Sequence, residues 1–262
     1  MIGERSRRDS AANTLVTDVS SITWEQRARI RGQLSLSYAY TFERNHTFGT
    51  EPPAPGLPVF DIAINIARLT AAVAWDTRDD PVDTISGSLV SLSLENAPES
   101  VGSDIRFVRE LVQAYHFRPW RQLVFASAAR FGIVSPLGGQ DLITSERFFA
   151  GGARTVRGVA EDSLGPIDPF FEAPEGGRLL LVLNQEARVP IYRWVRGVAF
   201  VDAGNVFETP RDASLRDLVG SLGVGVRLAT PFALFRVDFA QPVWGAPAGS
   251  SGRWIFGIGQ AF

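Results

Sequence analysis

Apolar and polar residues alternate with a period of two along much of the chain. In the segment QLSLSYAYTFE at residues 33–43, every second residue from Leu34 to Phe42 is leucine, tyrosine or phenylalanine. Successive side chains of a β-strand point to opposite faces of a sheet, so this pattern predicts a strand with one apolar and one polar face. The same pattern recurs at residues 68–76, 88–95, 179–191, 233–241 and 253–262. A helical period does not extend over a comparable length, so we expect a protein built mostly of strands.

Alternation and turn signals together predict about eleven strands. We place them near residues 14–27, 33–44, 65–76, 87–96, 105–117, 122–133, 179–191, 197–206, 220–229, 233–241 and 253–262. The first and the fifth of these alternate poorly. The connections are short and long in turn, and the long ones cover residues 45–64, 97–104, 134–178, 207–219 and 242–252.

Two-faced strands joined alternately by short turns and long loops are typical of an outer-membrane β-barrel. The apolar face would meet lipid, and the polar face, with charges such as Glu186 and Arg188, would line a wet lumen. A soluble β-sandwich is the alternative, and there the apolar face would form the core. Aromatic residues near strand ends and the terminal Phe262 favour the barrel. The predicted fold class is therefore all-β, an antiparallel transmembrane β-barrel.

Composition narrows the classes of function. Hydrophobic residues make up 45% of the chain and charged residues 21%, and the net charge of −2 gives no reason to expect nucleic acid. The chain has no cysteine, and its two histidines, His46 and His116, argue against a metal site. The sequence contains no nucleophile elbow, and GVGV at 223–226 lacks the third glycine of a dinucleotide loop. We therefore expect no cofactor, no metal and no enzymatic activity.

The connection at 134–178 contains ERFFAGGARTVRGVAEDSLGP, which is too long for a turn and too glycine-rich for a helix. Its Arg157 lies between Val156 and Gly158. A guanidinium presents a fork of donors suited to carboxylates. By strand parity, Glu186 and Asp202 both lie on the polar face. A solvated loop arginine is the other interpretation.

These segments resemble the outer-membrane Omp85 family, whose members include the barrel-assembly and translocation-assembly proteins. The resemblance covers roughly residues 65–262 and is most specific at the long loop, with its Val156-Arg157-Gly158 signature. Further similar segments are DTRDDP at 76–81, NQEARVPI at 184–191, VAFVDAGNVF at 198–207 and FGIGQAF at 256–262. The family signature usually continues with an aromatic residue, whereas Val159 follows here.

The resemblance implies that the long loop folds back into the lumen and that Arg157 meets the acids Glu186 and Asp202 on the inner wall. Because a lumen is wet, we expect the loss of this arginine to cost roughly 1–3 kcal/mol, less than in a dry pair.

The resemblance also implies a C-terminal strand signal, carried by Phe256, Gly257, Ile258 and Phe262. The seam between the first and last strands would open or pair with substrate strands. The partners implied are outer-membrane lipid, unfolded outer-membrane or secreted proteins, and periplasmic accessory proteins. The implied location is the outer membrane of a Gram-negative-type bacterium.

Family barrels have about sixteen strands, preceded by POTRA modules and a signal peptide, and the predicted strands match the last eleven. We therefore expect residues 1–262 to form a single partial barrel domain that lacks these N-terminal parts, with 134–178 as its lumen-entering extracellular loop. The predicted function is assembly or translocation of proteins at the outer membrane through a gated seam. The alternatives are a passive pore or structural barrel, or the barrel of a two-partner or lipase-fused transporter.

Overall fold

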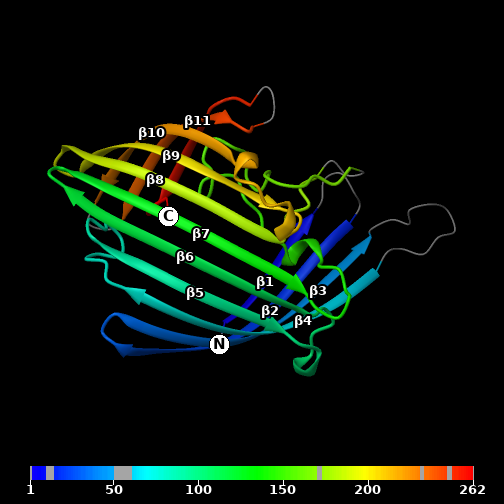
Figure 1. Cartoon of the computed structure of the whole chain (residues 1–262). Helices are drawn as coiled ribbons and strands as arrows, with labels where there is room; N and C mark the ends of the chain where they lie inside the picture. The colour runs from blue at the N-terminus through cyan, green and yellow to red at the C-terminus, as the bar shows by residue number, and fades with distance from the viewer. Residues whose placement is uncertain are drawn as a thin grey trace. The chain divides into compact units, whose positions relative to one another are not determined.

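The computed structural model describes residues 2–9, 15–49, 61–169, 173–230, 233–246 and 250–261. Within these ranges the chain forms twelve β-strands and four 3-10 helices of three residues each. The strands follow one another in chain order in a single sheet, and the colours of Figure 1 run through them in that order. The predicted all-β class is confirmed. No helix of the described residues has the length and apolar character needed to cross a membrane.

The strands are β1 (Ile2–Asp9), β2 (Leu15–Arg31), β3 (Leu34–Gly49), β4 (Asp61–Asp76), β5 (Gly87–Ala97), β6 (Phe107–Trp120), β7 (Leu123–Pro136), β8 (Leu179–Tyr192), β9 (Val195–Phe207), β10 (Val219–Ala229), β11 (Leu234–Trp244) and β12 (Arg253–Ile258). The 3-10 helices are η1 (Glu99–Val101), η2 (Thr144–Glu146), η3 (Pro210–Asp212) and η4 (Leu215–Asp217). Each of the eleven predicted strands corresponds to one of β2 to β12.

Strand β1 is not predicted by the sequence pattern. Five of its eight residues are charged, so the apolar half of the alternation is missing. Its backbone nevertheless pairs with β2 from Ile2 opposite Thr23 to Asp9 opposite Val16. Main-chain hydrogen bonding, which does not depend on side-chain type, accounts for a strand that the pattern does not reveal.

The chain divides into two compact units. One comprises residues 1–73, 93–109 and 135–142, and the other residues 74–92, 110–134 and 143–262. In the first unit β2 and β3 form a long antiparallel hairpin. Trp24 and Tyr38 are exposed on one face of this hairpin, with ring centroids 5.4 Å apart.

Charged pairs occupy the other face of the strands in this first unit. Arg68 Nη2 donates to Glu43 Oε2 at 2.7 Å, and Arg109 Nη1 donates to Glu95 Oε2 at 2.9 Å. All four side chains are less than a quarter exposed. Apolar residues are therefore exposed and ion pairs are sheltered, which is the reverse of a soluble core.

The second unit repeats this reversal along β8 and β11. Leu183 and Phe235 are 41% and 42% exposed, whereas their chain neighbours Asn184 and Arg236 are 5% exposed. A sandwich would bury the leucine and the phenylalanine, so the pattern supports the barrel interpretation. An apolar exposed face is stable where lipid rather than water covers it.

The connection between β4 and β5 also belongs to the second unit, and it is held together by its own hydrogen bonds. Asp79 Oδ1 accepts from the backbone N–H groups of Ile85 at 3.0 Å and Ser86 at 3.2 Å. Burial alone would raise the pKa of Asp79. The N–H donors together lower it by more than burial raises it, so the pKa lies below its usual value. Asp83 of the same connection forms an ion pair with Arg196 at the start of β9.

Several strands extend beyond their predicted bounds, as β3 does to Gly49 and β4 does from Asp61, and two other boundaries bear on the site. Strand β12 ends at Ile258 rather than at residue 262, because Gly259 leaves the extended backbone with φ +89 and donates its N–H to Leu234 O at 2.7 Å. Phe262 lies outside the described residues. Strand β7 continues to Pro136, so the long loop begins at residue 137 rather than 134.

The face assignment predicts unequal effects of arginine on two adjacent residues of β5. Leu92 is at the middle of the strand and 46% exposed, so Leu92→Arg should cost about 2–4 kcal/mol of unfolding free energy in lipid vesicles. Ser93→Arg, on the opposite face, should cost clearly less. Urea titration followed by tryptophan fluorescence measures both, and equal costs would contradict the assignment.

Candidate functional site

The long loop between β7 and β8 covers residues 137–178 and carries the Val156-Arg157-Gly158 motif. Thr155 Oγ1 fixes the turn before the motif, because it accepts from Gly151 N–H at 2.8 Å and donates to Gly151 O at 2.7 Å. Gly158 has φ +87, and a Cβ there would lie 2.9 Å from Ala240 O of β11. Glycine is therefore required twice at this position, for the backbone conformation and for the close approach to the sheet.

Apolar residues of the loop pack against the wall behind the motif. Val156 is fully buried and joins a cluster with other buried residues of the loop and of β8, β9 and β10. The members are Ala150, Val156, Leu164, Leu180, Val182, Val206 and Val219. Val159, in the place of the family's aromatic residue, packs against the same cluster. The loop is thus held by apolar contact as well as by charge.

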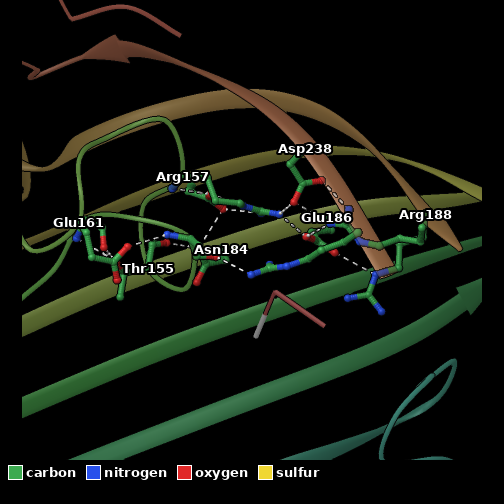
Figure 2. A network of polar contacts seen from close by, with 12 residues as sticks. Thr155, Arg157, Glu161, Asn184, Glu186, Arg188 and Asp238 are labelled. Carbon is green, nitrogen blue, oxygen red and sulfur yellow. Dashed lines mark hydrogen bonds and ion pairs between the residues drawn. The ribbon is translucent and has the colours of Figure 1, made fainter. Parts of the chain in front are cut away.

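Arg157 reaches from the loop into a group of carboxylates, as Figure 2 shows. Its Nε and Nη2 donate to Asp202 Oδ2 at 2.7 Å and Oδ1 at 2.8 Å, and its backbone N–H donates to Oδ2 at 3.1 Å. Its Nη1 donates to Glu186 Oε1 at 2.6 Å and lies 3.5 Å from Asp238 Oδ2. The structure therefore brings together Arg157, Glu186 and Asp202, the three residues that the sequence analysis singled out.

The side chains of Arg157 and its two acidic partners are less exposed to solvent than a wet lumen would make them. The side chains of Arg157, Glu186 and Asp202 are 1%, 0% and 0% exposed, so the wet-lumen assumption is wrong at this position. Burial lowers the pKa of the Arg157 guanidinium, but the hydrogen bonds and charge of Asp202, with the charges of Glu186 and Asp238, raise it above its usual value. The arginine is thus firmly charged, and the cost of removing it belongs to the range of buried pairs.

Phe200 is a contact of Arg157 that the sequence analysis missed. The guanidinium carbon lies 3.4 Å from the centroid of the Phe200 ring. Phe200 is two residues before Asp202 in β9, so it shares the inward face. Strand parity could have identified it as an inward neighbour of Asp202.

Further arginines surround the same carboxylates. Arg227 of β10 ion-pairs with Asp238, and Arg188 Nε donates to Glu186 Oε2 at 2.9 Å. The cluster contains Arg157, Arg188, Arg227 and Arg236 as cations, and Glu186, Asp202 and Asp238 as anions. Four positive charges against three negative leave a net charge of +1. Asn184 completes the hydrogen bonding, since its Nδ2 donates to Asp202 Oδ1 at 2.8 Å and to Thr155 O at 2.6 Å (Figure 2).

Arg236 of β11 touches both the loop and the last strand. Its Nη2 donates to Ala153 O of the loop at 3.1 Å. Its backbone is paired with Gly257 of β12, and a Cβ at Gly257 would lie 2.5 Å from Arg236 Nε. The absence of a side chain at 257 therefore leaves room for the guanidinium. Of the other predicted strand-signal residues, Phe256 and Ile258 are exposed on the apolar face.

No group of three or more histidine, cysteine or acidic residues is placed to hold a metal ion in the part of the chain that the structure describes. The carboxylates of the cluster instead accept hydrogen bonds from arginine and asparagine.

Comparison with known proteins decides the family. The Omp85 superfamily domain matches residues 8–262. The chain belongs to the Omp85 superfamily. The family resemblance inferred from the loop and strand motifs is thereby confirmed, and so is the outer-membrane location that goes with it.

Curated relatives extend well beyond the matched region. The outer membrane protein assembly factor BamA of Nitratidesulfovibrio vulgaris is 28% identical over 201 residues, which is 71% of this chain and 24% of that protein. A SAM50-like protein of Schizosaccharomyces pombe is 24% identical over 185 residues, 64% of this chain and 38% of that protein. This chain thus spans about a quarter to two fifths of these two relatives.

Solved structures support the fold. BamA from Haemophilus ducreyi lacking POTRA domains 1–3 superposes with a TM-score of 0.81 at 16% identity, covering 97% of this chain and 57% of that one. CdiB from Acinetobacter baumannii gives a TM-score of 0.59 at 12% identity, covering 94% of this chain and 42% of that one.

Removing the loop arginine should destabilise the barrel strongly. Arg157→Ala leaves buried Glu186 and Asp202 without their main donor, so we expect a loss of about 3–5 kcal/mol in unfolding free energy. Arg154→Ala, in the same loop but exposed, is the matched control and should change it by less than about 0.5 kcal/mol. Heat-modifiable migration on gels and urea titration in vesicles measure both. Equal stability of the two variants would refute a structural role for Arg157.

A double-mutant cycle tests the contact between Arg236 and the last strand. Gly257→Ala should cost about 1–3 kcal/mol, because the new Cβ displaces the guanidinium that is bonded to the loop. In an Arg236→Ala background the same change should cost almost nothing. Arg68→Ala is the control background, because Arg68 bonds to Glu43 instead, and there the two costs should add. An additive result with Arg236→Ala would show that the two residues act independently.

Proposed function

We propose that the chain is the barrel part of an outer-membrane assembly or translocation factor, which inserts β-barrel proteins or secretes partner proteins through a gated seam. The observation that carries this proposal is a pair of contacts between the long loop and β11, the strand next to the last one. Arg157 of the loop approaches Asp238, and Arg236 donates to Ala153 O of the loop. We call these two contacts the brace. Membership of the Omp85 superfamily supports it, as do the likenesses to BamA and CdiB.

The last strand has the position that such a seam requires. Strand β12 comes last in the order of hydrogen-bonded strands, and its six residues pair with β11 from Phe235 opposite Ile258 to Ala240 opposite Arg253. An unpaired strand edge costs several kcal/mol per exposed backbone group in lipid. A strand that adds to such an edge gains main-chain hydrogen bonds, and alternate side chains set its register.

The brace stabilises β11, the strand that lies next to the proposed seam. Strand β11 carries Asp238, which accepts from Arg227 and approaches Arg157, and Arg236, which bonds to the loop. Docking of the loop therefore holds β11 through buried ion pairs. Strand β12 lacks such pairs among the described residues and is held by its backbone pairing with β11, by the ring contact of Trp254 with Phe239 and by Ile255 at the edge of a small apolar cluster. We infer that β12 is the strand that moves.

The proposed partners follow from this arrangement. Lipid would cover the exposed apolar face, and unfolded outer-membrane or secreted proteins would pair at the seam. Periplasmic accessory proteins would act through N-terminal modules such as those of the longer relatives. Superfamily members of this type are assembly and transport factors, and we infer a structural rather than a catalytic task for Glu186, Asp202 and Asp238.

Disulfide trapping tests the seam, and the absence of native cysteine makes each introduced thiol unique. Ile255→Cys in β12 should form an adduct with a cysteine in the terminal strand of an unfolded outer-membrane client, at every second client position. Val224→Cys in β10, which is paired on both sides, is the control and should form none.

Each alternative function gives a different result. Adducts with a secreted partner, and none with a barrel client, would favour the secretion role of a two-partner transporter. Steady conductance in planar bilayers without any adduct would identify a passive pore and overturn the proposal.

A further inference from the structure

The exposed apolar face of the second unit contains a groove across β5 to β9. Its volume is about 440 Å³, within the range of small-molecule sites. Small outward residues form its floor, and they are Ala114, Ala129 and Ala203. Larger neighbours form its sides, since Ala129 and Ala203 both pair with Leu183 of β8. The hollow therefore comes from the distribution of side-chain size and not from a break in the sheet.

Two hydrogen-bonded polar pairs border this apolar floor. Ser88 Oγ lies 2.8 Å from His116 Nδ1, and Ser127 Oγ donates to Gln185 Oε1 at 2.6 Å. Polar side chains are costly on a face that meets lipid, so their presence here calls for a reason. His116 and Gln185 are both exposed, so their outer polar atoms can also reach a bound molecule.

The groove begins near the short turns at β5 and β6, and it reaches the long-loop half of β8 and β9 at Leu183 and Ala203. Ser88 is the second residue of β5, and its carbonyl accepts from Thr77 N–H, just beyond β4, at 2.8 Å. Trp75 and Trp120 are about half exposed at the ends of β4 and β6, as expected of an interfacial aromatic belt. Short turns face the periplasm in such barrels. The Ser88–His116 pair therefore lies near headgroup depth, and Ala129, the seventh residue of β7, lies deeper.

We propose that this groove binds one phospholipid of the periplasmic leaflet. One acyl chain lies over the floor between Ala114 and Ala203. Ester or phosphate oxygens of the same lipid accept hydrogen bonds from His116 and Gln185. The leaflet that faces the periplasm is built of phospholipid, which fixes the source of the acyl chain.

Size and charge favour a lipid over a protein occupant. The lining contains no charged residue. It is also much smaller than the roughly 20–30 residues that a stable protein interface uses on each side. An apolar trough with hydrogen-bonding groups along one side, one pair of them near the short turns, matches the shape and polarity of a phospholipid.

Native mass spectrometry of the full 262-residue chain in detergent tests the site, with 1-palmitoyl-2-oleoyl-phosphatidylethanolamine as the added probe. The wild-type chain should show one saturable lipid adduct. Ala129→Trp fills the groove and should weaken binding at least tenfold. Val224→Trp, on the exposed face of β10 away from the groove, is the matched control and should bind as the wild type does.

Two further variants cover a folding failure of Ala129→Trp and test the polar groups of the groove. Ala203→Leu replaces Ala129→Trp if the latter does not show heat-modifiable migration, which reports folding. His116→Phe with Gln185→Leu preserves side-chain size and should lower affinity several-fold without opening the groove. Equal binding by the groove-filling and control variants would overturn the proposal, because it would mean unspecific annular lipid. Saturation by lipid A but not by the phospholipid probe, or a co-purified protein at the groove, would overturn it as well.

Discussion

One buried guanidinium from the long loop contacts three carboxylates on the inner face of the second unit, beside the arginines that the strands supply. Arg157 donates to Glu186 and Asp202 and approaches Asp238, although it comes from a loop and they come from three strands. In a region with almost no solvent, these carboxylates are stable side by side only while their charge is balanced. The register of β8, β9 and β11 and the position of the loop are thus fixed by the same electrostatic requirement.

The same cluster links the loop to the end of the sheet. Arg236 bonds to the loop carbonyl of Ala153 and lies over Gly257 of the last strand. A polar network of this kind is cooperative, since each member keeps its neighbours oriented. The packing of Gly257 in β12 is therefore expected to be coupled to the docking of the loop through Arg236.

Much of this architecture follows from side-chain alternation. Parity in β8 and β9 correctly places Glu186 and Asp202 on the inward face, because an inward position in a strand depends only on odd or even numbering. Contacts across strands depend on register, which alternation leaves open, so the partnership of Arg236 with Gly257 could not be predicted. The burial of Arg157 could not be predicted from the sequence either, because it arises from the apolar packing of Val156 and its neighbours.

The position of the loop in the chain has a consequence for the order of folding. Arg157 precedes all of its carboxylate partners in sequence, and Asp238 follows it by 81 residues. Neighbouring strands can pair one after another, but this contact closes only when β11 has joined the sheet. Contacts across such long stretches form late because loop closure costs entropy. Docking of the loop would then act as a final checkpoint, at which a barrel with misregistered strands fails to lock.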